Sequence, residues 1–346
     1  MDILSIMLSA LCEKYALGTI QGEPQAVKGG LLHQMYHVTT NRGNYAIKLL
    51  NPDIMKRPHA MENMVDSERV ARRLAQEPGA LPVVAALERE QQQLLFIDMA
   101  RSSSPDSVRQ YAFVYTWIEA HSLFAPEISV SHCGRIGHIL GQIHGMKLDP
   151  ETLGIKPEEL RRPLYDWQGY LALAKEQGAP WISEYESMVP NLTRWDRTAT
   201  EAMESVGSCQ VVSHRDLDPK NVLWQDDQPY LIDWEAAGAV NPYQELLEVL
   251  NYWCSDENGR LALPLCQALL HEYTLFMDLR DVDWAPVFAV SCDGMLGWLE
   301  YTLKKALGIE KDEDAQGVSQ MTGTYRELLR YETQTGQLRE ILEASI

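Results

Sequence analysis

The residues with the most evident chemistry lie close together between positions 213 and 235. His214, Asp216 and Asn221 form the pattern His-x-Asp-x-x-x-x-Asn, and Asp233 follows twelve residues later within Ile-Asp-Trp-Glu. A carboxylate and a carboxamide are oxygen ligands that suit Mg²⁺, which accepts few protein ligands and prefers substrate phosphates for the rest. A further Asp nearby can accept the proton of a substrate hydroxyl. This combination of a base and phosphate-neutralising metal ions is typical of phosphoryl transfer.

The pattern around these residues predicts how they are brought together. Apolar runs before and after the segment 225–229 are typical of a β-hairpin with a five-residue loop. In a register that is symmetric about Asp227, Asn221 lies directly opposite Asp233, with the Cα atoms about 5 Å apart. Asp216 precedes Asn221 by five residues. We expect it to reach the same pocket as a base rather than as a second metal ligand.

Each of these residues alone has an ordinary structural explanation. Asp and Asn are common in turns because they hydrogen-bond to the nearby backbone. A single His is more often a satisfied buried residue than a catalytic one, so we assign His214 to bracing the loop. The combination of His-x-Asp-x-x-x-x-Asn with a following Asp-Trp-Glu is hard to obtain by chance. The functional interpretation is therefore preferred for the group as a whole.

The two motifs resemble the catalytic loop and the metal-binding motif of the aminoglycoside phosphotransferase/choline kinase family, which has the protein-kinase-like fold. The similarity runs in order from about Gly29 to about Leu250. It implies that Asp216 is the catalytic base and that Asn221 and Asp233 are Mg²⁺ ligands. It also implies that a nucleoside triphosphate, ATP or GTP, donates the phosphate.

A kinase also requires a lysine on a strand and a carboxylate to hold it. Lys48 lies within the apolar segment 46–50, which predicts a strand. In the helix expected to start at Pro58, Glu68 falls on the apolar face, where an unpaired carboxylate would be costly. We therefore predict that Glu68 pairs with Lys48, although Arg72 shares the same face of the helix.

Two further segments are expected to contact the nucleotide. Gly29 and Gly30, in Lys-Gly-Gly-Leu-Leu-His-Gln, resemble the phosphate-covering loop of the family, although a full Gly-x-Gly-x-x-Gly is absent. The segment that contains Thr116, Trp117 and Ile118 resembles the hinge, whose backbone hydrogen-bonds adenine in the family. The sequence does not choose among these three residues.

The elements that position these residues change in character along the chain. The first third reads as strands, expected at 35–40, 45–50, 82–87, 93–99 and 111–118, with one main helix between Pro58 and Pro78. Apart from the segment 211–233, the remainder is helical. Helices are expected at about 3–12, 129–145, 166–177, 182–206, 243–254, 262–279, 287–305 and 325–343, and a loop at 308–323.

This organisation predicts an α+β, bilobal, protein-kinase-like fold. Residues 1–119 would form an N-terminal nucleotide-binding lobe, with an antiparallel sheet, one main helix and the hinge. Residues 120–346 would form the larger, mostly helical C-terminal lobe with the catalytic and acceptor-binding residues. A chain of 346 residues is long enough for both lobes to bury a core.

Composition excludes several other classes of protein. With 49 Asp and Glu against 30 Lys and Arg, the net charge is −19, which would repel the phosphates of a nucleic acid. The sequence has no run of about 18 uncharged apolar residues, the length that could span a membrane. The apolar N-terminus lacks the basic flank of a signal peptide. Six scattered Cys without Cys-x-x-Cys indicate a reduced, cytoplasmic protein. A monomer or a homodimer is expected.

The uneven distribution of charge bears on the acceptor. Residues 1–119 carry 12 basic and 13 acidic side chains, whereas residues 120–346 carry 18 and 36. A concave site in the acidic part would attract cations, so we expect a small cationic or polyhydroxylated acceptor such as an aminoglycoside, an amino alcohol or a sugar. The possible contacts, each also compatible with an ordinary surface acid, are Asp218, Glu235, Asp256, Glu257 and Glu300.

Two alternatives remain open at this point. His214-Arg-Asp also occurs in protein Ser/Thr kinases, but here Asp218 stands where those enzymes have Lys, and Trp-Glu rather than Phe-Gly follows Asp233. Only seven residues separate Asp233 from Asn241, which leaves little room for an activation segment. A nucleotide-binding pseudokinase is expected to have lost one of the four central residues. All four are present, which argues against this alternative without excluding it.

Overall fold

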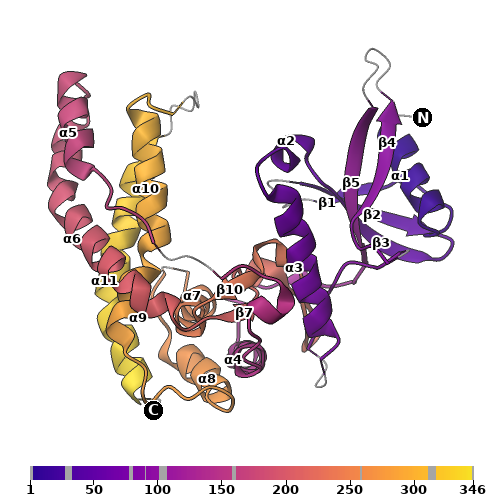
Figure 1. The fold of residues 1–346 in the computed structure, drawn as a ribbon. Coiled ribbons are helices and arrows are strands. Elements are labelled where there is room, and N and C mark those ends of the chain that lie inside the picture. Colours follow the sequence, from indigo (N-terminus) through magenta and orange to yellow (C-terminus); the bar gives the residue numbers. More distant parts are fainter. Residues whose placement is uncertain are drawn as a thin grey trace. The chain divides into compact units, whose positions relative to one another are not determined.

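A computed structural model describes residues 3–27, 33–77, 81–89, 91–100, 107–157, 161–257, 259–310 and 317–344. Gly29 and Gly30 lie outside these residues. The N-terminal part contains a five-stranded antiparallel sheet, and the larger C-terminal part is mainly helical, so the predicted fold class is confirmed (Figure 1). None of the helices in the described ranges combines the length and apolar character needed to cross a bilayer.

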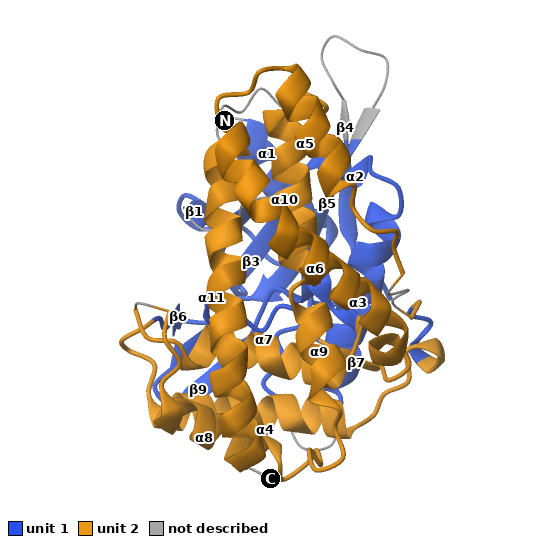
Figure 2. Ribbon diagram, turned by 90° about the vertical axis from the view of Figure 1, so that its left-hand side faces the viewer, with its two compact units in different colours: residues 1–124, 153–155, 214–238 blue, residues 125–152, 156–213, 239–346 orange. Residues whose placement is uncertain are grey.

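The chain forms two compact units that are coloured separately in Figure 2. Unit 1 comprises residues 1–124, 153–155 and 214–238, and unit 2 comprises residues 125–152, 156–213 and 239–346. The segment 214–238, which carries the two sequence motifs, thus groups with the N-terminal sheet. The sequence had placed it with the C-terminal lobe. The proposed division into domains after residue 119 stays a prediction.

The main sheet of unit 1 has the strand order β1-β2-β3-β5-β4. Its strands are β1 (Gln25–Val27), β2 (Gln34–Thr40), β3 (Gly43–Leu49), β4 (Leu95–Ala100) and β5 (Ser107–Thr116). The predicted β2–β3 hairpin is present, with Lys48 opposite Met35 on one side and Phe113 on the other. Because side chains alternate along a strand, Ile47 and Lys48 face opposite sides of the sheet.

Helices cover both faces of this sheet. Helix α1 (Ile3–Lys14) packs against the face that carries Val38 and Ile47. On the face of Lys48, Leu50 and Phe113 pack with Met64 of helix α3 (Ala60–Ala75), which follows the short helix α2 (Pro52–Met55). The main helix predicted after Pro58 is therefore present and brings its buried residues to the lysine side of the sheet.

A second, smaller sheet in unit 1 contains the hairpin that connects the two sequence motifs. It consists of β6 (His121–Ser122), β8 (Val222–Gln225) and β9 (Gln228–Leu231). The predicted strand at 82–87 is instead an irregular segment, in which only Val83 forms a bridge with Leu231. Leu231 accepts a bond from Val84 N–H at 2.9 Å and donates one to Pro82 O at 2.7 Å. These bonds attach the hairpin to the chain that follows α3.

Unit 2 contains eight helices and two short strands among its described residues. They are α4 (Val130–Gly145), α5 (Trp167–Glu176), α6 (Ile182–Gly207), β7 (Val211–Ser213), β10 (Gly238–Val240, with Gly238 in unit 1), α7 (Pro242–Cys254), α8 (Leu263–Tyr273), α9 (Trp284–Ser291), α10 (Asp293–Ala306) and α11 (Gly317–Ala344). The helix predicted at 287–305 is divided at Cys292, and α11 begins within the predicted loop.

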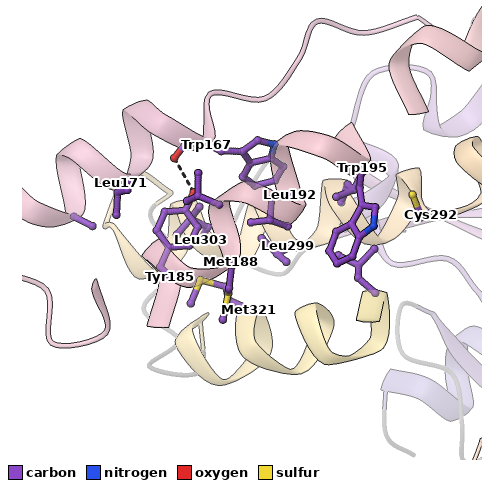
Figure 3. Close-up of a cluster of buried hydrophobic side chains, with 14 of the residues drawn as sticks. Trp167, Leu171, Tyr185, Met188, Leu192, Trp195, Cys292, Leu299, Leu303 and Met321 are labelled. Atoms are coloured by element: carbon purple, nitrogen blue, oxygen red, sulfur yellow. Dashed lines mark hydrogen bonds between the residues drawn. The ribbon is translucent and has the colours of Figure 1, made fainter. Parts of the chain in front are cut away.

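One hydrophobic core of unit 2 lies among helices α5, α6, α10 and α11 (Figure 3). Tyr185 is buried there, and its hydroxyl donates to Trp167 O at 3.0 Å, which satisfies the polar atom of an aromatic side chain. Leu192, Leu299 and Leu303 fill the space between the helices. All the residues of this core belong to unit 2.

Helices α4 and α8 of unit 2 pack closely against each other at a glycine. A Cβ at Gly137 of α4 would lie 2.1 Å from Leu269 O of α8, so Gly137→Ala must separate two packed backbones. Overpacking of this kind costs about 1–3 kcal/mol, and a domain of this size loses about 2–4 °C per kcal/mol. We expect the melting temperature, measured by calorimetry, to fall by about 2–12 °C.

Gly134→Ala in the same helix is the matched control. A Cβ there meets Glu272 Cγ at an ordinary 3.6 Å, and Ala has the higher helix propensity. Its melting temperature should equal or exceed that of the wild type. Equal melting temperatures for the Gly137→Ala and Gly134→Ala variants would contradict the close contact.

Candidate active site

His214 holds the loop between β7 and β8 from within unit 1. The side chain is fully buried, and its Nε2–H donates to Ile232 O at 3.0 Å, while Nδ1 accepts from Asp216 N–H at 3.3 Å. The ring also packs against Trp234 at a centroid distance of 4.4 Å. The same histidine therefore fixes the backbone at Asp216 and at the residue before Asp233.

Asp216 and Asn221 are in direct contact. Nδ2 of Asn221 donates to the backbone oxygen of Asp216 at 2.8 Å and to its Oδ2 at 2.9 Å. These bonds use the amide nitrogen and leave the Asn221 oxygen as the end that can bind a cation. The Asp216 side chain is about one-third exposed, so it can be reached by a substrate.

Lys220 is a neighbour of Asp216 that the sequence analysis missed. Its Nζ lies 3.3 Å from Asp216 Oδ2, and its N–H donates to Asp218 Oδ1 at 2.8 Å. The available signal was a lysine four residues after Asp216 and next to Asn221. The contact places a cation beside the carboxylate that the family resemblance assigns as the base.

The hairpin register differs from the predicted one. Val222 pairs with Leu231, and the turn consists of two residues, Asp226 and Asp227, rather than of five. Asn221 O consequently accepts from Ile232 N–H at 2.9 Å, so Asn221 lies opposite Ile232 and not opposite Asp233. The predicted register was wrong by one residue, because the polar residues at 225 and 228 pair within the ladder.

Asp233 leaves the hairpin in a left-handed conformation. Its φ is +59° and its ψ is +63°, a region in which Asp is tolerated better than most residues. A short 3₁₀ turn, Trp234–Ala236, follows directly. Backbone strain of this kind is concentrated at functional sites, and here it determines where the Asp233 carboxylate points.

Lys48 contacts two carboxylates from this segment. Its Nζ lies 2.9 Å from Asp233 Oδ1 and also forms an ion pair with Glu235. The lysine is only 7% exposed. Burial lowers the pKa of Lys48, but the charges of Asp233 and Glu235 outweigh that effect, so the pKa is raised and the lysine stays protonated.

The predicted pair between Lys48 and Glu68 is not formed. Glu68 is 4% exposed and accepts hydrogen bonds from the Tyr115 hydroxyl and from Ala86 N–H, the latter at 2.9 Å. Burial raises the pKa of Glu68, although both hydrogen bonds and the charge of Lys48 oppose this effect. The helical face predicted the burial of Glu68 correctly, but neutral donors of the same unit take the place of the cation.

His33 is a second residue that the sequence analysis did not select. It lies three residues after Gly30, and its Nδ1 accepts from Asn51 N–H at 3.0 Å. Its Nε2 faces Glu235 Oε1 at 3.6 Å. Lys48, Glu235 and His33 thus form one contiguous group on the lysine side of the sheet.

The backbone hydrogen bonds at the end of β5 distinguish among Thr116, Trp117 and Ile118, the three residues predicted as candidates to contact adenine. Trp117 N–H donates to Asn44 O at 3.0 Å, and the indole stacks on His37 at 3.9 Å. Within the described residues, the N–H of Ile118 has no partner, whereas its oxygen accepts from Ala120 N–H at 2.9 Å. Thr116 ends the strand. Of Trp117 and Ile118, Ile118 is therefore the residue whose backbone N–H could still donate to a ligand.

The residues considered for the acceptor occur in both units. Asp218 and Glu235 belong to unit 1, whereas Asp256, Glu257 and Glu300 belong to unit 2. Asp256 accepts from Arg260 N–H at 2.8 Å, and Glu257 is exposed. Glu300 is 8% exposed and binds the Tyr170 hydroxyl and Lys304, so its burial has a structural explanation within unit 2.

The donor atoms near the hairpin suit a metal that takes few protein ligands. The described part of the chain has no cluster of three or more His, Cys, Asp or Glu that could hold a metal ion. An amide oxygen from Asn221 and a carboxylate from Asp233 are hard oxygen donors, as Mg²⁺ prefers when phosphates complete its coordination. The residues present therefore fit Mg²⁺ bound together with a nucleotide, rather than a closed protein cage.

The fold and these residues define a class of protein. A buried strand lysine, a His-x-Asp-x-x-x-x-Asn loop and a following Asp are the parts of a phosphotransferase with the protein-kinase-like fold. The chain belongs to the phosphotransferase enzyme family (APH), whose family model matches residues 23–280. The predicted family and the prediction of a phosphotransferase are both confirmed.

Solved structures agree with the predicted protein-kinase-like fold. Spectinomycin phosphotransferase APH(9)-Ia, in complex with ADP and spectinomycin, has a TM-score of 0.66 and 15% identity, covering 92% of this chain and 93% of its own. The microcompartment-associated aminopropanol kinase has a TM-score of 0.58 and 14% identity, with 97% and 99% covered. Choline kinase from Cryptosporidium parvum has a TM-score of 0.54 and 13% identity, with 98% of both chains covered. A search among curated proteins gave no significant match.

Proposed function

We propose that this enzyme transfers the γ-phosphate of ATP to a hydroxyl group of a small cationic or polyhydroxylated acceptor. The observation that carries the proposal is the grouping, within unit 1, of Asp216 with Asn221 and of Lys48 with Asp233. Similarly folded kinases named for spectinomycin, aminopropanol and choline support a small acceptor. ADP in one of them supports the use of a nucleotide.

The roles of the chain's own residues follow from their contacts. Asp216, oriented by Asn221, would accept the proton of the acceptor hydroxyl. Lys48 would bind phosphate oxygens of the nucleotide, and Ile118 N–H would hydrogen-bond the base. Asn221 and Asp233 would hold Mg²⁺, which supplies neutralisation of the phosphate charge when it is bound.

The proposal is tested by measuring ADP formation from ATP and Mg²⁺ with a panel of aminoglycosides, amino alcohols and sugars. We expect acceptor-dependent turnover with at least one class, and a parallel series with GTP identifies the preferred nucleotide. A generic protein substrate with labelled ATP tests the protein kinase alternative. Nucleotide binding without turnover on any acceptor would favour the pseudokinase alternative instead.

A further inference from the structure

Within the described parts of the chain, one nitrogen of the almost fully buried His33 side chain has no hydrogen-bond partner. The exposed fraction of the side chain is 2%, and Nε2 is buried with no hydrogen-bond partner among the residues that the structure describes. Because Nδ1 accepts from Asn51 N–H, the proton of a neutral ring lies on Nε2. Burial lowers the pKa of His33, and Lys48 lowers it further against the opposing charges of Glu235 and Asp233, which favours this neutral ring.

The buried N–H of His33 is aimed at a carboxylate that depends on Lys48. Nε2 lies 3.6 Å from Glu235 Oε1, and the same oxygen contacts Lys48 Nζ. A normal N–H···O bond has a length of about 2.7–3.2 Å, so a movement of about half an ångström would form one. In the present arrangement, Lys48 forms an ion pair with Glu235, and His33 Nε2 has no acceptor among the described residues.

Binding of a nucleotide would change this balance. Lys48 contacts Asp233 and Glu235 together, and phosphate oxygens would compete with these carboxylates for its three N–H donors. The Glu235 side chain is three-quarters buried, and a buried carboxylate that loses its partner bears a desolvation cost. A donor already aimed at Glu235 would reduce the cost of releasing Lys48.

We propose that His33 is a positioning residue that donates Nε2–H to Glu235 when Lys48 turns to the nucleotide phosphates. This inference rests on the proposed function and adds a residue to it. His33 does not contact the reacting atoms. It acts through Glu235, by making Lys48 available to the nucleotide.

Two substitutions separate this role from a purely structural one. In His33→Asn, the amide oxygen can still accept from Asn51 N–H, but the donor toward Glu235 is lost. In His33→Gln, the longer amide can place a donor near the Nε2 position, but the acceptor for Asn51 is lost. His59→Asn is the matched control, because the His59 side chain is exposed and its described polar contact is with Glu62, outside this group of residues.

The measurement is the affinity for Mg·ADP by calorimetry, together with kcat and KM for ATP once an acceptor is known. We expect His33→Asn to weaken Mg·ADP binding and to raise KM for ATP about tenfold, with kcat changed less than threefold. His33→Gln should recover most of the affinity, and His59→Asn should match the wild type. In a Glu235→Ala background, adding His33→Asn should not weaken Mg·ADP binding any further.

The inference is overturned if His33→Asn binds Mg·ADP like the wild type. It is also overturned if His33→Gln binds Mg·ADP more weakly than His33→Asn, because the important contact of the ring would then be the bond to Asn51. A third contradicting result is that His33→Asn still weakens Mg·ADP binding in the Glu235→Ala background. A wild-type protein that binds no nucleotide would instead remove the proposed function. The two failures are therefore distinguishable.

Discussion

Asp216→Asn is expected to lower kcat about 10³-fold, because general base catalysis by a positioned side chain contributes about 10²–10⁴-fold. The substitution removes the charge and the proton acceptor but keeps an oxygen that can accept from Asn221 Nδ2, which now bonds Asp216 at 2.9 Å. The loop should stay in place. Affinity for Mg·ADP should therefore change less than threefold, while single-turnover phosphoryl transfer to the acceptor becomes slow.

Asp226→Asn supplies the matched control for this experiment. Asp226 lies in the exposed turn of the same hairpin, with φ of +52°, a conformation that Asn adopts readily. Its kcat should equal that of the wild type. If Asp216→Asn turns over at the wild-type rate, the assignment of Asp216 as the base is wrong, whatever the remaining geometry.

Asp233→Asn is expected to lower kcat/KM for ATP by about 10³-fold, because stabilisation of transition-state charge by a metal ion is worth several kcal/mol and about 4 kcal/mol corresponds to that factor. Asn tolerates the left-handed backbone at this position, where φ is +59°. Lys48 keeps its ion pair with Glu235. The substitution therefore tests the charge of one ligand rather than the fold of the turn.

The diagnostic measurement is the affinity for ADP with and without Mg²⁺. In the wild type, Mg²⁺ should tighten ADP binding, and in Asp233→Asn this enhancement should be largely lost while metal-free ADP still binds. Asp226→Asn again serves as the control and should retain the enhancement. An undiminished effect of Mg²⁺ in the Asp233→Asn variant would show that Asp233 is not a metal ligand.

Local patterns predicted the elements of the site better than their register. The β2–β3 hairpin and helix α3 are present where hydrophobic periodicity and turn residues placed them. The β8–β9 hairpin is present as well, but a symmetric loop of five residues was the wrong assumption. Gln225 and Gln228 pair within the ladder, and polar residues of this kind can extend a hairpin as readily as form its loop.

The sequence also did not predict which groups contact the buried charged side chains. The helical face correctly marked Glu68 as buried, and a cation was the obvious partner. Tyr115 and Ala86 N–H satisfy it instead, and both come from segments whose position against α3 depends on tertiary packing. Lys48 in turn finds Asp233, which lies 185 residues away in sequence. No periodicity encodes such a contact.

The assembly of unit 1 from distant segments has a consequence for dividing the gene. Lys48 precedes residue 124 and Asp216 and Asp233 follow it, although all three belong to one compact unit. If the polypeptide were cut after Phe124, one fragment would contain Lys48 and the other would contain Asp216 and Asp233. Turnover by two co-expressed fragments would then report that unit 1 had assembled, with the backbone hydrogen bonds of Leu231 to Pro82 and Val84 formed between the fragments.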